Sequence, residues 1–437
     1  MNIKEITEYL VDFQHREFPS LIKRDLEIKE TKKIISIIGP RRAGKTYFIY
    51  QSMEEMLKDM KRENLIYLNF EDTRLLGITF KDIKEIIKLQ WKLYPNSMKK
   101  LVVFIDEPQN IKNWEHAVRS LYDEGFKIFL TGSSSKLLSK EIASSLRGRT
   151  LSYLLMPFSF REVLKLKKFE CSFNKLSSKE RSLLDYYLDN YIKLGGFPEI
   201  LIEEDKQTQI KILKEYLDLI VYRDVVERYN LKNTKLIQWL IKCLIASFSK
   251  EFSVHKTYLT LKSQGIKVSK NTLYTYVSLL EDSLFAFFIP SFSQSQRKKG
   301  FSINKVYIND IGFVNLLEVS TDRGKRMENI VFLELQRRKS PLTSIFYWKN
   351  VQKEEVDFII KEGQKLKQLI QVCYDISDLN TKKREFRALF KASKELKCNN
   401  LLIITEDKEG EERIEKKKIK FIPLWKWLLI DSFKNKK

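Results

Sequence analysis

The sequence contains little histidine, cysteine, glycine and proline. Among 437 residues there are 3 His, 4 Cys, 14 Gly and 9 Pro. The His are far apart and no two Cys form a CxxC pair, so the sequence predicts neither a zinc ribbon nor a disulfide framework. The scarcity of Gly and Pro excludes a linker rich in these residues and a collagen-like segment. With 43% hydrophobic residues, the chain is still able to build folded cores.

Long apolar runs are also missing. The longest runs, such as residues 284–290, are far shorter than the ~20 residues that span a bilayer. The first ten residues, MNIKEITEYL, lack the apolar stretch of a signal peptide. Cysteine without paired spacing is typical of a reducing compartment. We therefore expect a cytoplasmic protein that makes no membrane contact.

Positive charge, by contrast, is abundant and uneven. The chain has 80 Lys and Arg against 57 Asp and Glu, a formal net charge of +23. Residues 231–305 hold 12 basic and three acidic side chains, whereas residues 161–230 are balanced. Such a local excess is typical of a surface that binds a nucleic-acid backbone. A lysine-rich solvated surface, as in many thermophilic proteins, explains the charge alone equally well.

Apolar runs alternate with helical periodicity in the first third of the chain. This pattern predicts a parallel β-sheet covered by helices on both faces, and hence the α/β class. The five runs lie at 34–38, 65–70, 101–106, 126–131 and 151–155. Residues 178–229 indicate helices only.

A phosphate-binding motif, GxxxxGK[ST], follows the first run directly and precedes a helical stretch. Glycines let successive backbone N–H groups point at phosphate oxygens, and the helix N-terminus adds its dipole. Lys45 is expected to reach the β- and γ-phosphates of ATP, and Thr46 to hold Mg²⁺. The complete motif is Gly39, Pro40, Arg41, Arg42, Ala43, Gly44, Lys45 and Thr46.

The third apolar run ends in Asp106 and Glu107, at the strand end where α/β sheets bind ligands. Asp106 is expected to bind Mg²⁺, and Glu107 to activate the attacking water. The alternative is that the two acidic residues cap a helix. Ser133 follows the fourth run and is a candidate for contacting the γ-phosphate or the water. Arg147 and Arg149 are candidates for stabilising transition-state charge, in their own subunit or in a neighbouring one.

These motifs together resemble the archaeal ATPase family, a P-loop group of the extended AAA+ class. The resemblance is carried by GPRRAGKT at 39–46, VVFIDEPQNIKNWE at 102–115 and SLRGRTLSYLLMPFSFRE at 145–162. The stretches EYLDLIVYRDVVERY, VYINDIGFVNLL and MENIVFLELQRR are similar to the usual C-terminal companion region. The resemblance implies an ATPase module, a winged-helix module and a nuclease-like terminal module. From the sequence we place them at 1–160, 231–305 and 306–437, with a helical lid or linker segment at 161–230.

The winged helix is also indicated by the residues themselves. Three helical stretches are followed by an apolar strand, FAFFIPSF, and a basic hairpin tip. A third helix with polar side chains at its start and a basic wing is typical of DNA docking. The candidate DNA contacts are Lys262, Lys267, Lys270, Asn271, Tyr274, Arg297, Lys298 and Lys299. A winged helix that contacts proteins is the alternative.

The last module resembles the PD-(D/E)xK nuclease core, which needs carboxylates around Mg²⁺ and a lysine beside the attacking water. Glu328 or Glu334 is the candidate helix carboxylate, and Asp357 the strand carboxylate. The usual ExK triplet falls at 371–373, where Gln371 replaces the acid and Cys373 the lysine. We therefore expect an inactive, vestigial nuclease module.

The sequence thus predicts a Mg²⁺-dependent ATPase whose nucleotide state is coupled to DNA binding through the winged helix. ATP and Mg²⁺ are the expected cofactors, DNA is the expected partner, and a homo-oligomer is possible. Two alternatives stay open: a slow ATP-driven signalling switch that acts through protein partners, and an ATP-regulated nuclease.

Overall fold

The computed structural model describes residues 2–132, 146, 148–170, 175–293, 303–317, 322–414 and 417–430, with the exception of the Lys99 side chain. The chain divides into two compact units. Unit 1 comprises Met1–Pro157 with Asp282–Leu284, and unit 2 comprises Phe158–Glu281 with Phe285–Lys437. None of the helices within the described ranges combines the length and the apolar character that a membrane span requires.

Unit 1 is an α/β domain built on one five-stranded parallel sheet, in the order β2-β3-β4-β1-β5. The strands are β1 Ile34–Ile38, β2 Leu65–Asn69, β3 Val102–Asp106, β4 Lys127–Gly132 and β5 Thr150–Leu154. The helices are α1 Ile3–His15, α2 Lys45–Met56, α3 Asp82–Leu93 and α4 Trp114–Asp123. Each strand predicted from an apolar run is present within one residue at either end, which confirms the α/β class.

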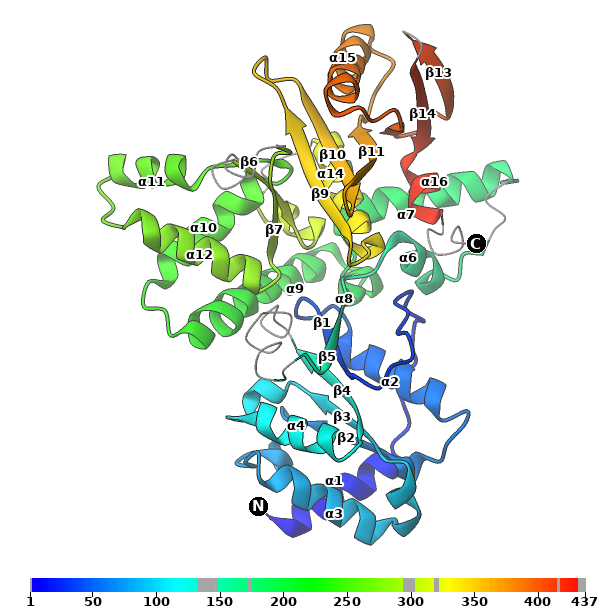
Figure 1. Ribbon diagram of the computed structural model, residues 1–437, viewed down its shortest axis with the longest axis vertical. Coiled ribbons are helices and arrows are strands. Elements are labelled where there is room, and N and C mark those ends of the chain that lie inside the picture. Colours follow the sequence, from blue (N-terminus) through cyan, green and yellow to red (C-terminus); the bar gives the residue numbers. More distant parts are fainter. Residues whose placement is uncertain are drawn as a thin grey trace. The chain divides into compact units, whose positions relative to one another are not determined.

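Helices cover both faces of this sheet (Figure 1). Ile34 and Ile38 belong to a core with α1, α3 and α4, whereas Ile35 and Ile37 belong to a core with α2. Because successive side chains on a strand point to opposite faces, a strand buried on both faces reads as an uninterrupted apolar run. This is the reason why IISII predicts its strand so accurately.

Unit 2 begins with helices. They are α6 Phe160–Leu166, α7 Ser178–Leu194, α8 Pro198–Ile202 and α9 Lys206–Leu219, and α9 continues as a π-helix over Ile220–Glu227. Capping boxes start two of them: Ser159 and Glu162 at α6, and Ser177 and Glu180 at α7. The helices from α7 onward occupy residues 178–229, the segment in which the sequence indicates helices only.

A buried carboxylate fixes the chain where α7 ends. Gly195 has a φ of 81°, in the left-handed region that favours glycine, and a Cβ there would collide with the Asp310 carboxylate. That carboxylate accepts hydrogen bonds from the backbone N–H groups of Gly196, at 2.7 Å, and of Gly312, at 2.8 Å. Asp310 therefore holds together two segments of unit 2 that lie more than 100 residues apart in the sequence.

A small antiparallel sheet and three helices form the middle of unit 2. In chain order the elements are α10 Thr234–Ala246, β6 Lys250–Phe252, α11 Val254–Ser263, α12 Lys270–Asp282, β7 Ala286–Ile289 and β8 Asn304–Ile308. The sheet order is β6-β8-β7, so β8 is the central strand. The expected module boundary at residue 305 falls inside this strand.

A six-stranded mixed sheet follows, in the order β13-β14-β12-β11-β10-β9. Its strands are β9 Thr343–Lys349, β10 Glu355–Glu362, β11 Lys365–Val372, β12 Leu401–Thr405, β13 Gly410–Ile414 and β14 Lys417–Pro423. Its helices are α14 Arg323–Arg338, α15 Leu379–Leu396 and α16 Leu424–Leu429. The chain after β7 pairs with the edge strand β9, since Phe292 N donates to Tyr347 O at 2.6 Å. The two sheets of unit 2 are therefore joined.

Candidate functional site

The phosphate-loop motif forms a tight connection at the carboxyl edge of the parallel sheet, between β1 and α2. Gly39 has no room for a side chain, because a Cβ there would collide with the carbonyl oxygen of Leu155. Gly44 has a φ of 89° and immediately precedes α2. Both motif glycines are thus required by the backbone of the loop itself.

The Lys45 side chain is buried within this loop and is only 7% exposed. Its ammonium donates hydrogen bonds to the carbonyl oxygens of Gly39, at 3.2 Å, and Pro40, at 3.0 Å. A cation held against the inner side of a glycine-bearing loop is the local charge that a polyphosphate requires.

Asp106 lies at the end of β3 and is 2% exposed. Its Oδ2 accepts hydrogen bonds from Thr46 Oγ1, at 2.7 Å, and Tyr67 Oη, at 2.9 Å, and its Oδ1 accepts one from Thr131 Oγ1. Burial and the neighbouring Glu107 carboxylate raise the pKa of Asp106, while the hydrogen bonds from Thr131, Thr46 and Tyr67 oppose that rise. The structure thus brings the two predicted magnesium ligands, Thr46 and Asp106, into direct contact.

Glu107 follows Asp106 with a φ of 52°, a left-handed conformation that non-glycine residues seldom adopt. Its half-buried carboxylate accepts a hydrogen bond from Gln109 Nε2. Such backbone strain gathers at functional sites. The Asp106–Glu107 pair therefore ends β3 in a conformation that a plain strand-to-helix connection does not need.

Two further predicted residues, Ser133 and Arg147, lie outside the described residues. Arg149 is described, and it precedes β5 at the amino edge of the sheet, where its side chain forms an ion pair with Asp123 at 3.0 Å. The phosphate loop follows β1 at the carboxyl edge, and β1 and β5 are parallel. Arg149 is therefore not brought to the site of its own chain, and only its action on a neighbouring subunit remains a prediction.

Sequence reasoning missed two groups at this site, Tyr67 and Arg24. It named Thr131 among the hydroxyl groups after the fourth run but did not foresee its hydrogen bond to Asp106. Arg24 is 6% exposed, and its guanidinium donates to the carbonyl oxygens of Ala43, at 2.8 Å, and Met156, at 2.6 Å. It thus links the phosphate loop to the chain that follows β5. Tyr67 is the one residue with a hydroxyl in the run LIYLNF. A buried phenol needs a hydrogen-bond partner, so a tyrosine in this buried strand could have predicted a polar contact at the site.

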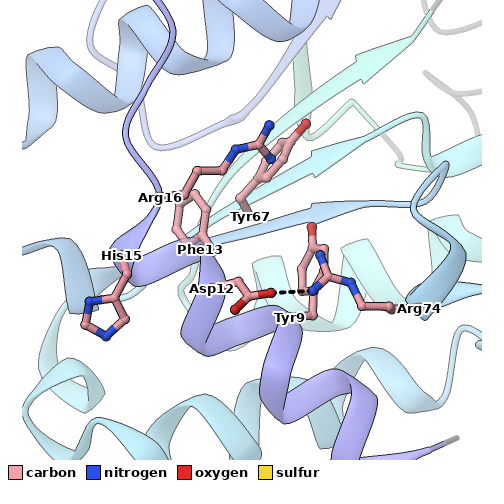
Figure 2. Close-up of a pocket in the computed structure, with 7 residues that line it drawn as sticks. All are labelled: Tyr9, Asp12, Phe13, His15, Arg16, Tyr67 and Arg74. Carbon is pink, nitrogen blue, oxygen red and sulfur yellow. Dashed lines mark hydrogen bonds and ion pairs between the residues drawn. The ribbon is translucent and has the colours of Figure 1, made fainter.

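A pocket of about 420 Å³ adjoins Tyr67 on the side of α1 (Figure 2). Its lining consists of Tyr9, Asp12, Phe13, His15, Arg16, Tyr67 and Arg74. The Arg74 guanidinium forms an ion pair with Asp12 at 2.6 Å and lies 4.8 Å from the centre of the Tyr9 ring. Tyr67 thus belongs both to this pocket and to the hydrogen bonds around Asp106.

The predicted DNA-contact residues that are described lie on α11, on α12 and on the turn between them. The side chains of Lys262, Lys267, Lys270, Asn271 and Tyr274 are all exposed. The opposite face of α12 is buried through Leu273, Tyr276 and Leu280, as its periodicity predicts. Arg297, Lys298 and Lys299 lie outside the described residues.

A buried ionic cluster joins α14, β8 and β10. The Lys305 ammonium lies 2.8 Å from a Glu328 oxygen, 2.6 Å from a Glu355 oxygen and 3.1 Å from an Asp357 oxygen. Glu328 also accepts a hydrogen bond from Tyr307 Oη at 2.7 Å. Burial by itself lowers the pKa of Lys305, but the surrounding carboxylates raise it well above its usual value.

The cluster shows which of the two candidate helix carboxylates lies at the nuclease-like site. Glu328 belongs to it, and the prediction for Glu334 needs a correction. Glu328 lies beside Asp357, whereas Glu334 forms ion pairs with Arg161, at 3.0 Å, and Arg338, at 2.8 Å. Six residues along a helix is a rotation of about 240°, so Glu328 and Glu334 cannot face the same site. Glu334 was therefore wrongly placed among the vestigial nuclease residues.

Gln371 supports the cluster as a hydrogen-bonding residue. Its Oε1 accepts from the backbone N–H of Asp357 at 3.2 Å, and its Nε2 donates to Glu385 at 2.7 Å. Burial raises the pKa of Cys373 to about 12, so its thiol remains neutral at physiological pH. Sequence reasoning missed Lys305, Glu355 and Glu385. The signal for Lys305 was a charged residue in a strand, NKVYI, whose other residues are mostly apolar.

Comparison with known proteins identifies the N-terminal part. Residues 31–164 match the family model described as an AAA domain. Two domains of unknown function follow, DUF8612 at residues 185–323 and DUF4143 at residues 323–427.

Two relatives that match most of the chain are described as uncharacterized proteins. The protein MJ1544 of Methanocaldococcus jannaschii is 42% identical over 416 residues, which is 94% of this chain and 91% of the relative. A Haemophilus influenzae protein is 29% identical over 359 residues, which is 81% of this chain and 85% of the relative.

Two solved structures share 12% identity with the chain. Cdc6p from Pyrobaculum aerophilum has a TM-score of 0.26 and is covered to 88%, with 68% of this chain aligned. Drosophila ORC bound to AT-rich DNA and Cdc6 has a TM-score of 0.20 and is covered to 92%, with 72% of this chain aligned. These low scores add nothing to the assignment, which rests on the AAA-domain match and on the archaeal relative. Residues 31–164 carry an AAA domain, and the whole chain belongs to the same family as MJ1544.

Proposed function

We propose that the chain is a cytoplasmic Mg²⁺-dependent ATPase whose nucleotide state is coupled to DNA binding. The observation that carries the proposal is the contact between Thr46 and Asp106, at 2.7 Å, beside a phosphate loop that encloses the Lys45 ammonium. A hydroxyl and a carboxylate oxygen are the hard ligands that Mg²⁺ prefers, so the side chains fit this ion. The loop geometry and the buried cation likewise fit the phosphates of ATP.

Each side chain has a separate role in this proposal. Lys45 binds the terminal phosphates, and Thr46 and Asp106 hold the ion, which when bound neutralises charge on the phosphate oxygens. Glu107 orients the attacking water and accepts its proton. Tyr67 and Thr131 fix both oxygens of Asp106, so that its carboxylate keeps one orientation.

DNA binding is assigned to residues 231–305. The order helix, strand, helix, helix, strand, strand, with β8 at the centre of the sheet, supports a winged helix. The exposed Lys267, Lys270 and Tyr274 lie near or on the first turns of α12, the helix that such domains place against DNA. Lysines contact phosphates and so bind without selecting a sequence.

Steady-state ATP hydrolysis tests the proposal, measured alone and with duplex or single-stranded DNA, at low and high salt. We expect Mg²⁺-dependent turnover that DNA stimulates, and stimulation that weakens as salt rises. Turnover that DNA leaves unchanged at every salt concentration contradicts the coupling and favours the signalling switch. Absence of turnover in the wild type together with absence of ATP binding contradicts the nucleotide site itself.

A further inference from the structure

The last part of unit 2 has the element order of a metal-dependent nuclease core, but its carboxylates are not free to hold the metal. The order is α14, three antiparallel strands, α15 and a fourth strand, with Glu328 on the helix and Asp357 on the middle strand. A divalent ion in such a core needs several free carboxylate oxygens. Within the described residues, no group of three or more His, Cys, Asp and Glu side chains is arranged to hold a metal ion.

A lysine takes up the oxygens that a metal ion would use. The Lys305 ammonium lies between Glu328, on α14, and Asp357, on β10, and contacts an oxygen of each within 3.1 Å. A third contact is an ion pair with Glu355 at 2.6 Å. Three carboxylates thus surround the ammonium, and its charge has the sign that they require.

Three of the four members of the cluster are also withdrawn from a nucleic-acid backbone, whereas Glu355, 27% exposed, lies at its rim. The side chains of Lys305, Asp357 and Glu328 are 2%, 8% and 10% exposed. Tyr307, also buried, covers Glu328 from the same strand as Lys305. A lysine that assists cleavage must reach the attacking water and the phosphate, and Lys305 is buried too deeply to do so.

We propose that the Lys305 ammonium permanently replaces a divalent cation among Glu328, Glu355 and Asp357, which makes this nuclease-like module metal-free and cleavage-inactive. The ion pairs instead fasten β8, the central strand of the small sheet, to α14 and β10. This inference concerns unit 2 alone and holds whether or not the nucleotide site turns over ATP.

Removal of the lysine side chain tests the replacement directly. In the full-length Lys305→Ala protein, the three carboxylates lose their cation and gain space. We expect Mn²⁺ to bind at least tenfold more tightly to this variant than to the wild type, measured by calorimetry without nucleotide. We also expect Mn²⁺ to raise the melting temperature of the variant and to leave that of the wild type unchanged.

Two controls locate the ion. The double variant Lys305→Ala/Asp357→Asn should lose the gained Mn²⁺ binding, because one ligand is neutral, whereas Lys305→Ala/Asp106→Asn should keep it. Gained binding that survives Asp357→Asn overturns the proposal.

The wild type supplies a test that does not depend on the folding of Lys305→Ala. Asp357→Asn should not reduce the Mn²⁺ binding of the wild type. Nor should it reduce any DNA cleavage that depends on Mg²⁺ or Mn²⁺. Either reduction shows an open metal site in the wild type and overturns the proposal.

Discussion

Thr46 and Asp106 are 60 residues apart in the chain, yet Thr46 Oγ1 donates a hydrogen bond to Asp106 Oδ2 at 2.7 Å. The contact arises because β1 and β3 are parallel strands of one sheet, so that the residues after each meet at its carboxyl edge. Four side-chain and backbone features gather there: a loop of two required glycines, a buried lysine, a hydroxyl and an immobilised carboxylate. Predictions about the nucleotide site follow from this arrangement.

The first prediction concerns Lys45. Lys45→Ala removes the ammonium that the carbonyl groups of the loop hold, so ATP affinity should fall by at least tenfold and turnover should be abolished. Lys58→Ala, an exposed lysine just beyond α2, is the matched control and should behave as the wild type. The measurement is binding of a fluorescent ATP analogue together with phosphate release. Undiminished turnover in Lys45→Ala would remove the basis for this site.

The second prediction separates binding from chemistry. Glu107→Gln keeps the size of the side chain but cannot accept a proton, so ATP should still bind while turnover falls by roughly 10²-fold or more. Glu115→Gln, in the first turn of α4, is the control. Single-turnover kinetics measures both steps. If Glu107→Gln hydrolyses ATP at the wild-type rate, the base lies elsewhere.

The third prediction concerns the DNA surface. Replacement of Lys267 and Lys270 by Gln removes two exposed charges beside α12. If each neutralises one phosphate, the slope of log affinity against log salt should become less steep by about 0.9 per lysine. Lys365→Gln, exposed on β11, is the control and should leave the slope unchanged. Fluorescence anisotropy over a salt series provides the slopes. An unchanged slope in the double variant would show that Lys267 and Lys270 do not contact DNA phosphates.

The fourth prediction is a pH dependence of stability. Burial raises the pKa of Asp310 to about 7, although hydrogen bonds from the backbone of Gly196 and Gly312 oppose the shift. The native state therefore binds this proton more tightly than the unfolded chain, where the usual value is 3.8. The stabilisation is fully present below pH 3.8 and is lost as the pH rises through about 7.

A comparison with Asp310→Asn isolates that contribution, since the amide does not titrate. The unfolding free energy of the wild type relative to the variant should fall between pH 4 and pH 7.5, by on the order of 4 kcal/mol. Urea unfolding at several pH values measures it, with the exposed Asp407→Asn as a control for general charge effects. A constant difference across this range would show that Asp310 stays ionised.

The sequence predicts local features of this molecule well and long-range contacts poorly. The run IISII gives β1 with its observed ends, because this pattern depends on neighbouring residues only. The hydrogen bond between Tyr67 and Asp106 spans 39 residues, and Lys305 meets its partners 23 to 52 residues away. No periodicity reports such contacts, so the search for a lysine at position 373 could not find the one at 305.

The placement of β8 limits how this family can evolve. One strand completes the small sheet beside the candidate DNA-binding helices and also supplies Lys305 to the carboxylates of the next module. A gene rearrangement that exchanged or deleted either module at residue 305 would cut that strand and leave buried acids without their counter-ion. A rearrangement that leaves both modules folded is therefore expected to carry β8, α14 and β10 together.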